Sequence, residues 1–219
     1  MSREQDRGVN GADQRQELVE HGRRMNALGI NQGKSGNLSV RLAKGFLVTP
    51  SAVPYEIMQP DDIVEMRWDG TYDGKRRPST EWRLHRDIYL AREDARAIVH
   101  AHAMFATTLA CLDQEIPAFH YMVAVAGGST IPCAPYATFG TQELSDCTVA
   151  ALTGRNACLM SHHGMIAFSD GLPSALSVAA EVETLSAMYW RALQLGAPAV
   201  LAEEEMVRVL GKFALYGKP

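Results

Sequence analysis

Short strand-like segments alternate with helical segments along most of this chain, and this alternation constrains the fold more than any other sequence feature. Strand patterns cover residues 38–42, 46–49, 62–68, 97–102 and 157–161. Residues 129–136 contain two prolines, which predicts an edge strand or an extended loop. Helical patterns cover residues 13–28, 80–93, 103–112, 141–152, 173–195 and 203–215. The alternation predicts an α/β fold, and the consecutive strands early in the chain predict a sheet that is at least partly antiparallel.

The ends of the pattern suggest how the chain is organised. Residues 1–12 are polar, and we expect a frayed tail there, followed by a single domain over 13–219. Ser79 or Thr80 would cap the helix over 80–93. The first residues lack the apolar stretch of a signal peptide, which favours a cytoplasmic location.

Composition and charge exclude several classes of protein. The hydrophobic fraction is 47% and the charged fraction 21%, which is ordinary for a globular protein. No apolar run approaches the roughly 20 residues that a membrane span needs. The formal net charge is -4 without a basic stripe, so we expect neither a nucleic-acid nor a membrane partner. A small anionic substrate remains compatible, because a local pocket can be positive.

The cysteines argue against a thiolate metal site. They are Cys111, Cys133, Cys147 and Cys158, and no two form a Cys-x-x-Cys pair. Their neighbours are apolar, so we expect buried free thiols in a reducing compartment.

Histidines provide the strongest candidate for chemistry. His100 and His102 would point to the same face of a strand, because side chains alternate along it. His162 and His163 follow another strand, where Gly164 would allow a sharp turn, and either could supply a third imidazole. Three imidazoles with an open position are typical of catalytic zinc. Taken alone, however, a His-x-His pair is more often structural, so both interpretations stand at this level.

The other candidate features are weaker. Gly33-Lys34-Ser35 resembles the end of a nucleotide-binding loop, but the glycine required at position 28 is Leu28, so that motif is excluded. The turn over 31–37 could still cradle a phosphate, or simply lead into a strand. Glu81, taken alone, would be a solvated acid near a helix start. His21, His85 and His120 show no partner pattern and are interpreted as structural.

Taken together and in order, these motifs resemble the class II aldolase/adducin family. The resemblance covers nearly the whole chain after the tail. It is carried by residues 28–39, 49–55, 78–85, 99–102, 120–141, 162–164 and 212–217. It implies a three-layer α/β/α sandwich with a largely antiparallel central sheet. It also implies a homotetramer with sites at subunit interfaces, and a mobile C-terminal tail from about residue 211.

The family resemblance further implies an activity. The chain would be a metal-dependent aldolase that reversibly cleaves a ketose 1-phosphate to dihydroxyacetone phosphate and an aldehyde. The substrate would be L-fuculose 1-phosphate or a related 5-deoxypentulose or 5-methylthioribulose 1-phosphate. Zn²⁺ is the expected cofactor, and Mn²⁺ or Co²⁺ would also fit. The small phosphorylated sugar is the expected partner.

Residue by residue, the resemblance assigns the metal to His100, His102 and His163. Glu81 would be the acid/base and also a metal ligand, which the substrate displaces from the metal. The positions that match phosphate-binding residues are Asn37, Ser51, Ala52, Ser79 and Thr80, with Lys34 beside them. Tyr121 would serve the aldehyde side of a neighbouring subunit's site, and Tyr216 would close over the substrate from the tail.

Two positions depart from the family pattern. Lys34 stands where a small hydroxyl residue is usual, and it would either face the phosphate or point to solvent. Ala52 stands where glycine is usual, and its Cβ disfavours a positive φ.

Other functions on the same scaffold are a pentulose-phosphate 4-epimerase and a methylthioribulose-phosphate dehydratase. The long match around Tyr121 and residues 139–141 favours the aldolase. A non-catalytic adducin-like module is disfavoured because all three histidines and Glu81 are present.

Overall fold

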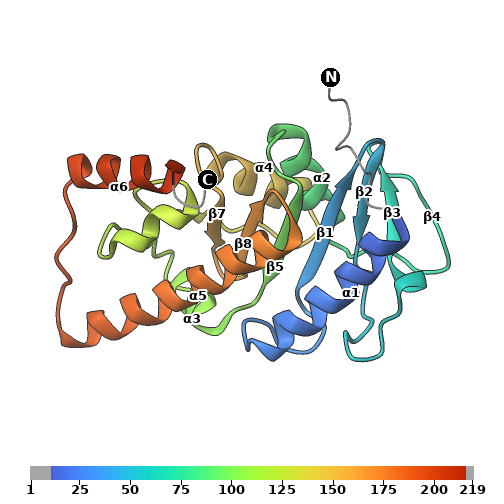
Figure 1. Cartoon of the computed structure of the whole chain (residues 1–219). Coiled ribbons are helices and arrows are strands. Elements are labelled where there is room, and N and C mark those ends of the chain that lie inside the picture. The colour runs from blue at the N-terminus through green and yellow to red at the C-terminus, as the bar shows by residue number, and fades with distance from the viewer. Residues whose placement is uncertain (1–10, 216–219) are drawn as a thin grey trace, which may run out of the picture.

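The computed structural model describes residues 11–215, which form one eight-stranded sheet covered by helices on both faces (Figure 1). The strands are β1 (Asn37–Leu42), β2 (Gly45–Val48), β3 (Val64–Arg67), β4 (Tyr72–Asp73), β5 (Ala97–Ala101), β6 (Cys133–Ala134), β7 (Ala157–Met160) and β8 (Gly164–Ser169). The α-helices are α1 (Gly11–Ala27), α2 (Trp82–Ala91), α3 (Met104–Ala110), α4 (Gln142–Ala151), α5 (Leu172–Leu195) and α6 (Glu203–Leu215). Two 3₁₀-helices are η1 (Pro60–Asp62) and η2 (Tyr121–Ala126).

The sheet is largely antiparallel, as the sequence predicted. Its strand order is β4-β3-β2-β1-β5-β8-β7-β6. Within the described residues, β6 and β7 are the only neighbours that run parallel, at one edge of the sheet. The neighbouring strands β5 and β8 lie inside the sheet, flanked by β1 and β7, and all five residues of β5 are buried.

Apolar side chains on the two faces of the sheet form two separate cores. Val99 of β5 lies in one core with residues of α1, α3 and α5, whereas its neighbour Ile98 lies in the other with residues of α2 and α4. Adjacent strand residues point to opposite faces, so each helix layer covers one face. Figure 1 shows α1, α3 and α5 on the near side of the sheet and α2 and α4 behind it. The expected three-layer α/β/α sandwich is therefore confirmed.

The sequence pattern missed β8. Residues 164–169 read Gly-Met-Ile-Ala-Phe-Ser, and the first five are buried. A strand covered on both faces shows no alternation of apolar and polar residues, which is the signal that pattern analysis uses. The structure also places the short strand β4 in a stretch that reads as turns, and η2 where no element was expected.

Several expected boundaries shift. Helix α1 begins at Gly11, inside the segment expected as a tail, and α6 continues to Leu215, past the expected start of a C-terminal tail at 211. Helix α2 begins at Trp82 rather than Thr80. Neither Ser79 nor Thr80 is therefore its cap. The Ser79 amide instead donates to the carbonyl oxygen of Thr49 at 3.1 Å, which keeps this segment in a loop.

The expectation of uniformly buried cysteines was wrong. Cys158 in β7 is buried, but Cys111 is exposed and the other two cysteines are partly exposed. Cys111 follows the end of α3, where the chain turns at the surface. Among the described residues, no helix combines the length and apolar character needed to cross a membrane.

Asp87 links the two helices on the far face. It lies on α2 and accepts hydrogen bonds from Ser145 Oγ and Gln142 Nε2 of α4, both at 2.7 Å. Burial raises the pKa of this carboxyl, but hydrogen bonds from Arg86, Ser145 and Gln142 lower it by a larger amount. The net shift of the pKa is therefore downward. A lowered pKa means that the ionised form stabilises the fold above about pH 4 and loses this contribution as the pH falls.

We therefore expect Asp87→Ala to lower the free energy of unfolding at pH 7 by about 2 kcal/mol, the scale for hydrogen bonds to a charged group. Urea unfolding at pH 7 and at about pH 2 should show a smaller difference from wild type at the lower pH, where the carboxyl is protonated. Asp146→Ala is the control, because this exposed acid contacts Gln142 within α4 only. An equal loss in both variants would contradict the assignment.

Candidate functional site

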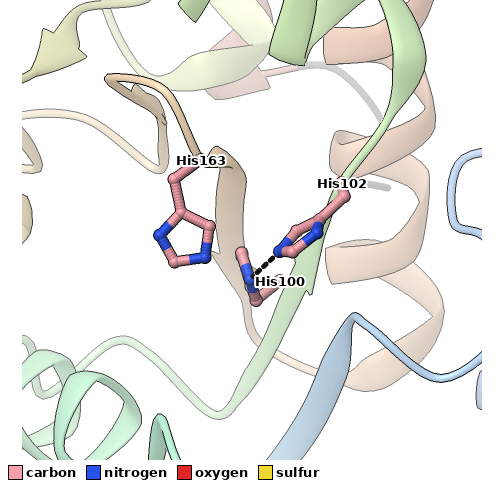
Figure 2. Close-up of side chains that lie close together, drawn as sticks. All are labelled: His100, His102 and His163. Atoms are coloured by element: carbon pink, nitrogen blue, oxygen red, sulfur yellow. Dashed lines mark hydrogen bonds between the residues drawn. The ribbon is translucent and has the colours of Figure 1, made fainter. Parts of the chain in front are cut away.

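Three histidines from two neighbouring parts of the sheet converge at one point (Figure 2). His100 lies in β5, opposite Asn37 of β1 and Ile166 of β8. His102 follows the end of β5. His163 lies in the three-residue turn that joins β7 to β8, whose ends pair at Met160 and Gly164. Because β8 is the neighbour of β5, the turn brings His163 beside the other two rings.

The turn differs from expectation in how it bends. Its residue with a positive φ is His162, at 52°, rather than Gly164. Gly164 is needed for a different reason: a Cβ there would lie 2.6 Å from the carbonyl oxygen of Ala101. The close approach of β8 to β5 thus depends on the missing side chain, and it keeps His163 near His102.

The distances within this cluster fit a divalent cation. One ring nitrogen from each histidine can be chosen so that all three lie within 4.8 Å of one another. Nε2 of His100 and Nε2 of His102 are 3.1 Å apart. Adjacent nitrogens around a tetrahedral zinc ion, with bonds of about 2.0–2.1 Å, are about 3.3–3.4 Å apart. The sequence prediction singled out these three residues, and the structure brings them together.

The orientation of His100 supports the same interpretation. Its Nδ1 lies 2.8 Å from the carbonyl oxygen of Met165. A carbonyl can only accept, so Nδ1 carries the proton, and Nε2 of the neutral ring presents a lone pair to the cluster. A backbone carbonyl that fixes the tautomer of a ligand in this way is a common feature of histidine metal sites.

Glu81 lies against this cluster at the start of α2. One carboxylate oxygen, Oε2, accepts a hydrogen bond from Asn37 Nδ2 at 2.9 Å and is 3.2 Å from Nε2 of His100. The other, Oε1, is 3.0 Å from Nε2 of His163, but this contact lacks hydrogen-bond geometry. Oε1 is therefore a buried oxygen without a hydrogen-bond partner, which costs free energy unless a ligand or a cation compensates it.

Electrostatics inside the cluster are strongly coupled. Burial raises the pKa of Glu81, but the charges of His100 and His163 and their close contacts with the carboxylate lower it more, so the carboxyl stays ionised. Burial lowers the pKa of His100, and Glu81 more than offsets this, so the net shift is upward. Burial, with repulsion from His100 and His163, lowers the pKa of His102 to about 4. A neutral His102 ring is available as a ligand at neutral pH.

A chain of buried polar side chains extends from Glu81 into the sheet. It runs from Asn37 through His85 and Ser39 to Tyr89. The sequence interpretation left His85 as structural and did not include Ser39 or Tyr89. A usable signal was present: residues 81, 85 and 89 are four apart, which is helix spacing, and residues 37 and 39 share one face of a strand.

A cavity of about 360 Å³ opens beside the histidines. Its lining includes Glu81, His102 and His163 together with Thr80 and Ser35. Its other wall is aromatic and was not predicted: Tyr136 and Phe139 line it, with His162 packed edge-on against the Tyr136 ring.

Four of the positions expected to hold phosphate lie in two adjacent loops, and Thr80 is the one among them that lines this cavity. Pro50 pairs with Pro78, which brings the loop of Ser51 and Ala52 beside the loop of Ser79 and Thr80. Thr80 is exposed and lines the cavity, whereas Ser79 is buried and its Oγ accepts from the Glu81 amide at 3.3 Å. Asn37 is also buried, beside Glu81. Lys34 is exposed in the turn next to Ser35.

Tyr121 does not line this cavity. Tyr121 is half-exposed on η2 and lines a separate cavity of about 700 Å³, with Phe119 and residues of α6. Tyr216 lies outside the described residues. The expectation that Tyr121 serves a neighbouring subunit stays a prediction.

Comparison with known proteins identifies the family of the chain. Residues 16–190 match the model of the Class II Aldolase and Adducin N-terminal domain. The chain belongs to the class II aldolase/adducin family.

Relatives within this family are named as aldolases. The chain is 52% identical over 200 residues to a 5-methylthioribulose-1-phosphate/5-deoxyribulose-1-phosphate aldolase of Rhodospirillum rubrum, covering 91% of this chain and 90% of that protein. It is 48% identical over 194 residues to L-fuculose phosphate aldolase of Escherichia coli K12, covering 88% and 90%. A solved structure of an L-fuculose 1-phosphate aldolase matches with a TM-score of 0.89 and 39% identity, covering 91% and 95%. The expected family, fold and enzyme class are thus confirmed.

The departure at Ala52 has a structural consequence, since this residue adopts a φ of 61°. A left-handed conformation costs a residue with a Cβ about 1–2 kcal/mol. We expect Ala52→Gly to raise the free energy of unfolding by about 0.5–1 kcal/mol, after the entropy cost of glycine is subtracted. Ala180→Gly, within α5, should instead lower it by about 1 kcal/mol. Thermal or urea unfolding measures the stability of both variants. A loss of stability in Ala52→Gly as large as that in Ala180→Gly would contradict the proposed strain at position 52.

Proposed function

We propose that this protein is a metal-dependent aldolase that reversibly cleaves ketose 1-phosphates between carbons 3 and 4. The products are dihydroxyacetone phosphate and an aldehyde. One observation carries the proposal: an ionised, partly unpaired carboxylate, Glu81, lies against three converging imidazoles at the wall of a cavity. Relatives at 48–52% identity, named as aldolases of such sugar phosphates, support it.

His100, His102 and His163 would hold the cation. Nitrogen donors favour zinc, and manganese or cobalt would fit the same donors. When bound, a divalent cation supplies a Lewis acid that stabilises negative charge developing on the substrate's oxygens. Three neutral ligands leave the full charge of the ion available for this purpose.

Glu81 would handle the proton at carbon 3. In the condensation direction its carboxylate accepts that proton from dihydroxyacetone phosphate, and in the cleavage direction it returns it. Its two oxygens are suited to different tasks. Oε2 is held by Asn37, whereas Oε1 has no hydrogen-bond partner and is available to the substrate.

The phosphate would bind in the two loops beside the cavity. Thr80 supplies an exposed hydroxyl, and Ser51, Ala52 and Ser79 lie in the paired loops. The second N–H of the Asn37 amide and the exposed Lys34 ammonium would complete the site. Binding the non-reacting phosphate orients the carbons that react.

Tyr121 would act on the carbon-4 oxygen at a neighbouring subunit's site in a homotetramer, and Tyr216 would close over the substrate. The half-exposed position of Tyr121, away from the histidine cavity of its own chain, supports this arrangement. We place the reaction in the cytoplasm, where such metabolic aldolases would meet phosphorylated sugars.

Substrates with an apolar end are favoured. Tyr136 and Phe139 present exposed aromatic surface to the cavity. The names of the relatives point in the same direction, because 5-deoxyribulose ends in a methyl group and 5-methylthioribulose in a methylthio group. Moving an apolar group of this kind from water to an aromatic wall lowers the free energy of the complex.

The test is a panel of ketose 1-phosphates with a coupled assay for dihydroxyacetone phosphate. The panel pairs 5-deoxyribulose with ribulose 1-phosphate, which differ by one hydroxyl, and adds 5-methylthioribulose and L-fuculose 1-phosphates. We expect kcat/KM to be about 10–100-fold higher for the deoxy sugar than for ribulose 1-phosphate. Chelation should abolish the activity and zinc should restore it. Activity in metal-free protein, with a lysine trapped by borohydride, would overturn the mechanism.

A second prediction concerns Glu81. Glu81→Gln keeps the size of the side chain and removes its proton-accepting carboxylate. We expect kcat to fall about 10²–10⁴-fold, the range for one acid/base group. Bound zinc, measured by elemental analysis, should stay near one ion per chain. Glu65→Gln on β3 is the control, since this exposed acid lies away from the cavity. A near-normal kcat in Glu81→Gln would show that another group moves the proton.

A further inference from the structure

A single chain of hydrogen bonds leads from the core to the proposed acid/base. Tyr89 Oη is 2.7 Å from Ser39 Oγ, which is 2.6 Å from His85 Nδ1. His85 Nε2 is 2.5 Å from Asn37 Oδ1, and Asn37 Nδ2 is 2.9 Å from Glu81 Oε2. Two residues come from strand β1, two from helix α2, and Glu81 from the residue before that helix.

The donor and acceptor of every hydrogen bond in this series follow from the Glu81 carboxylate at its end. An ionised carboxylate only accepts, so the Asn37 amide must donate to Glu81. The Asn37 carbonyl oxygen then faces His85, which must donate from Nε2. With Nε2 protonated, the Nδ1 of a neutral ring accepts from Ser39, and Ser39 in turn accepts from Tyr89. No other arrangement of protons satisfies all five groups while the ring is neutral.

Burial keeps this arrangement in place. All five side chains belong to buried residues, and His85 has no exposed surface. Burial, with repulsion from His100, lowers the pKa of His85 to about 3, although Glu81 opposes this. The ring is therefore neutral at physiological pH. A reversed Asn37 amide would direct its oxygen at the Glu81 carboxylate and its N–H groups at the His85 donor.

Glu81 depends on this amide for its orientation. The Asn37 N–H is the hydrogen bond that holds Oε2, and Oε1 has none. Rotation of the carboxylate would move Oε1 from its position beside His163, and small misplacements of a reacting group cost large factors in rate.

We propose that His85 is a positioning residue: its Nε2–H fixes the Asn37 amide, which orients Glu81, while Ser39 and Tyr89 fix the tautomer of His85. The inference rests on the proposed role of Glu81 as acid/base. It adds that the sequence Glu81-x₃-His85-x₃-Tyr89 works as one unit with Asn37 and Ser39.

The first test reads the tautomer directly and does not depend on activity. Nitrogen NMR of the ¹⁵N-histidine-labelled protein, without added metal, should show His85 neutral with the proton on Nε2 from pH 5 to pH 8. His85→Phe assigns the signal. Ser39→Ala should shift the Nδ1 resonance, whereas Ser186→Ala, which removes an equally buried hydroxyl within α5, should not. A proton on Nδ1, or a charged ring, would overturn the proposal.

The second test is a double-mutant cycle in kcat for the best substrate of the panel. His85→Phe should lower kcat about 10–100-fold, the range for residues that orient a site group, with little change in KM. In the Glu81→Gln background the same substitution should change kcat less than about 2-fold, because the group it positions is gone. His85→Gln, which can offer an N–H to Asn37, should recover part of kcat even if it unfolds as easily as His85→Phe.

These outcomes separate the two proposals. Wild-type protein that cleaves no ketose 1-phosphate but shows the Nε2–H tautomer overturns the proposed function. Two results overturn the positioning role and leave the aldolase assignment intact. One is an equal effect of His85→Phe on kcat in the wild-type and Glu81→Gln backgrounds. The other is a loss of kcat that follows thermal stability across all variants.

Discussion

The register of β5 between β1 and β8 is the constraint on which the site depends. It sets His100 opposite Asn37 on one side and opposite Ile166 on the other. The first pairing brings the amide that holds Glu81 next to an imidazole, and the second leads into the hairpin that carries His163. A shift of one residue in either ladder would direct His100 to the opposite face of the sheet, where α5 packs.

This arrangement combines groups that would be unstable separately. An ionised carboxylate that is 5% exposed and a fully buried imidazole each carry a desolvation cost. Together they lower that cost, because Glu81 raises the pKa of His100 while His100 lowers the pKa of Glu81. The neutral polar chain behind them adds hydrogen bonds without adding charge. Among the described residues of the cluster, Oε1 of Glu81 is the buried side-chain oxygen that has no hydrogen-bond partner, and it lies beside the ring nitrogen of His163.

The layer architecture and most elements could be predicted from the sequence, because their apolar periodicity is visible. The missed strand, β8, is buried on both faces and so lacks that periodicity. The residues of the cluster could be identified from ordered motifs, but the choice of His163 over His162 came from the family resemblance. The role of His85 was beyond that reasoning, since a hydrogen-bond chain between a helix and a strand depends on a pairing register that one sequence does not fix. The aromatic wall of Tyr136 and Phe139 was missed for a similar reason: both lie in an irregular segment after β6.

The turn between β7 and β8 has a consequence for related chains. It is three residues long, its middle residue is left-handed, and the strand after it touches β5 so closely that only glycine fits at position 164. Adding or deleting one residue here would rotate the third imidazole out of the cluster while leaving both strands intact. Insertions in this fold should therefore accumulate in outer connections, such as that between α5 and α6, and the length of this hairpin should serve as a marker of which family members still bind a metal.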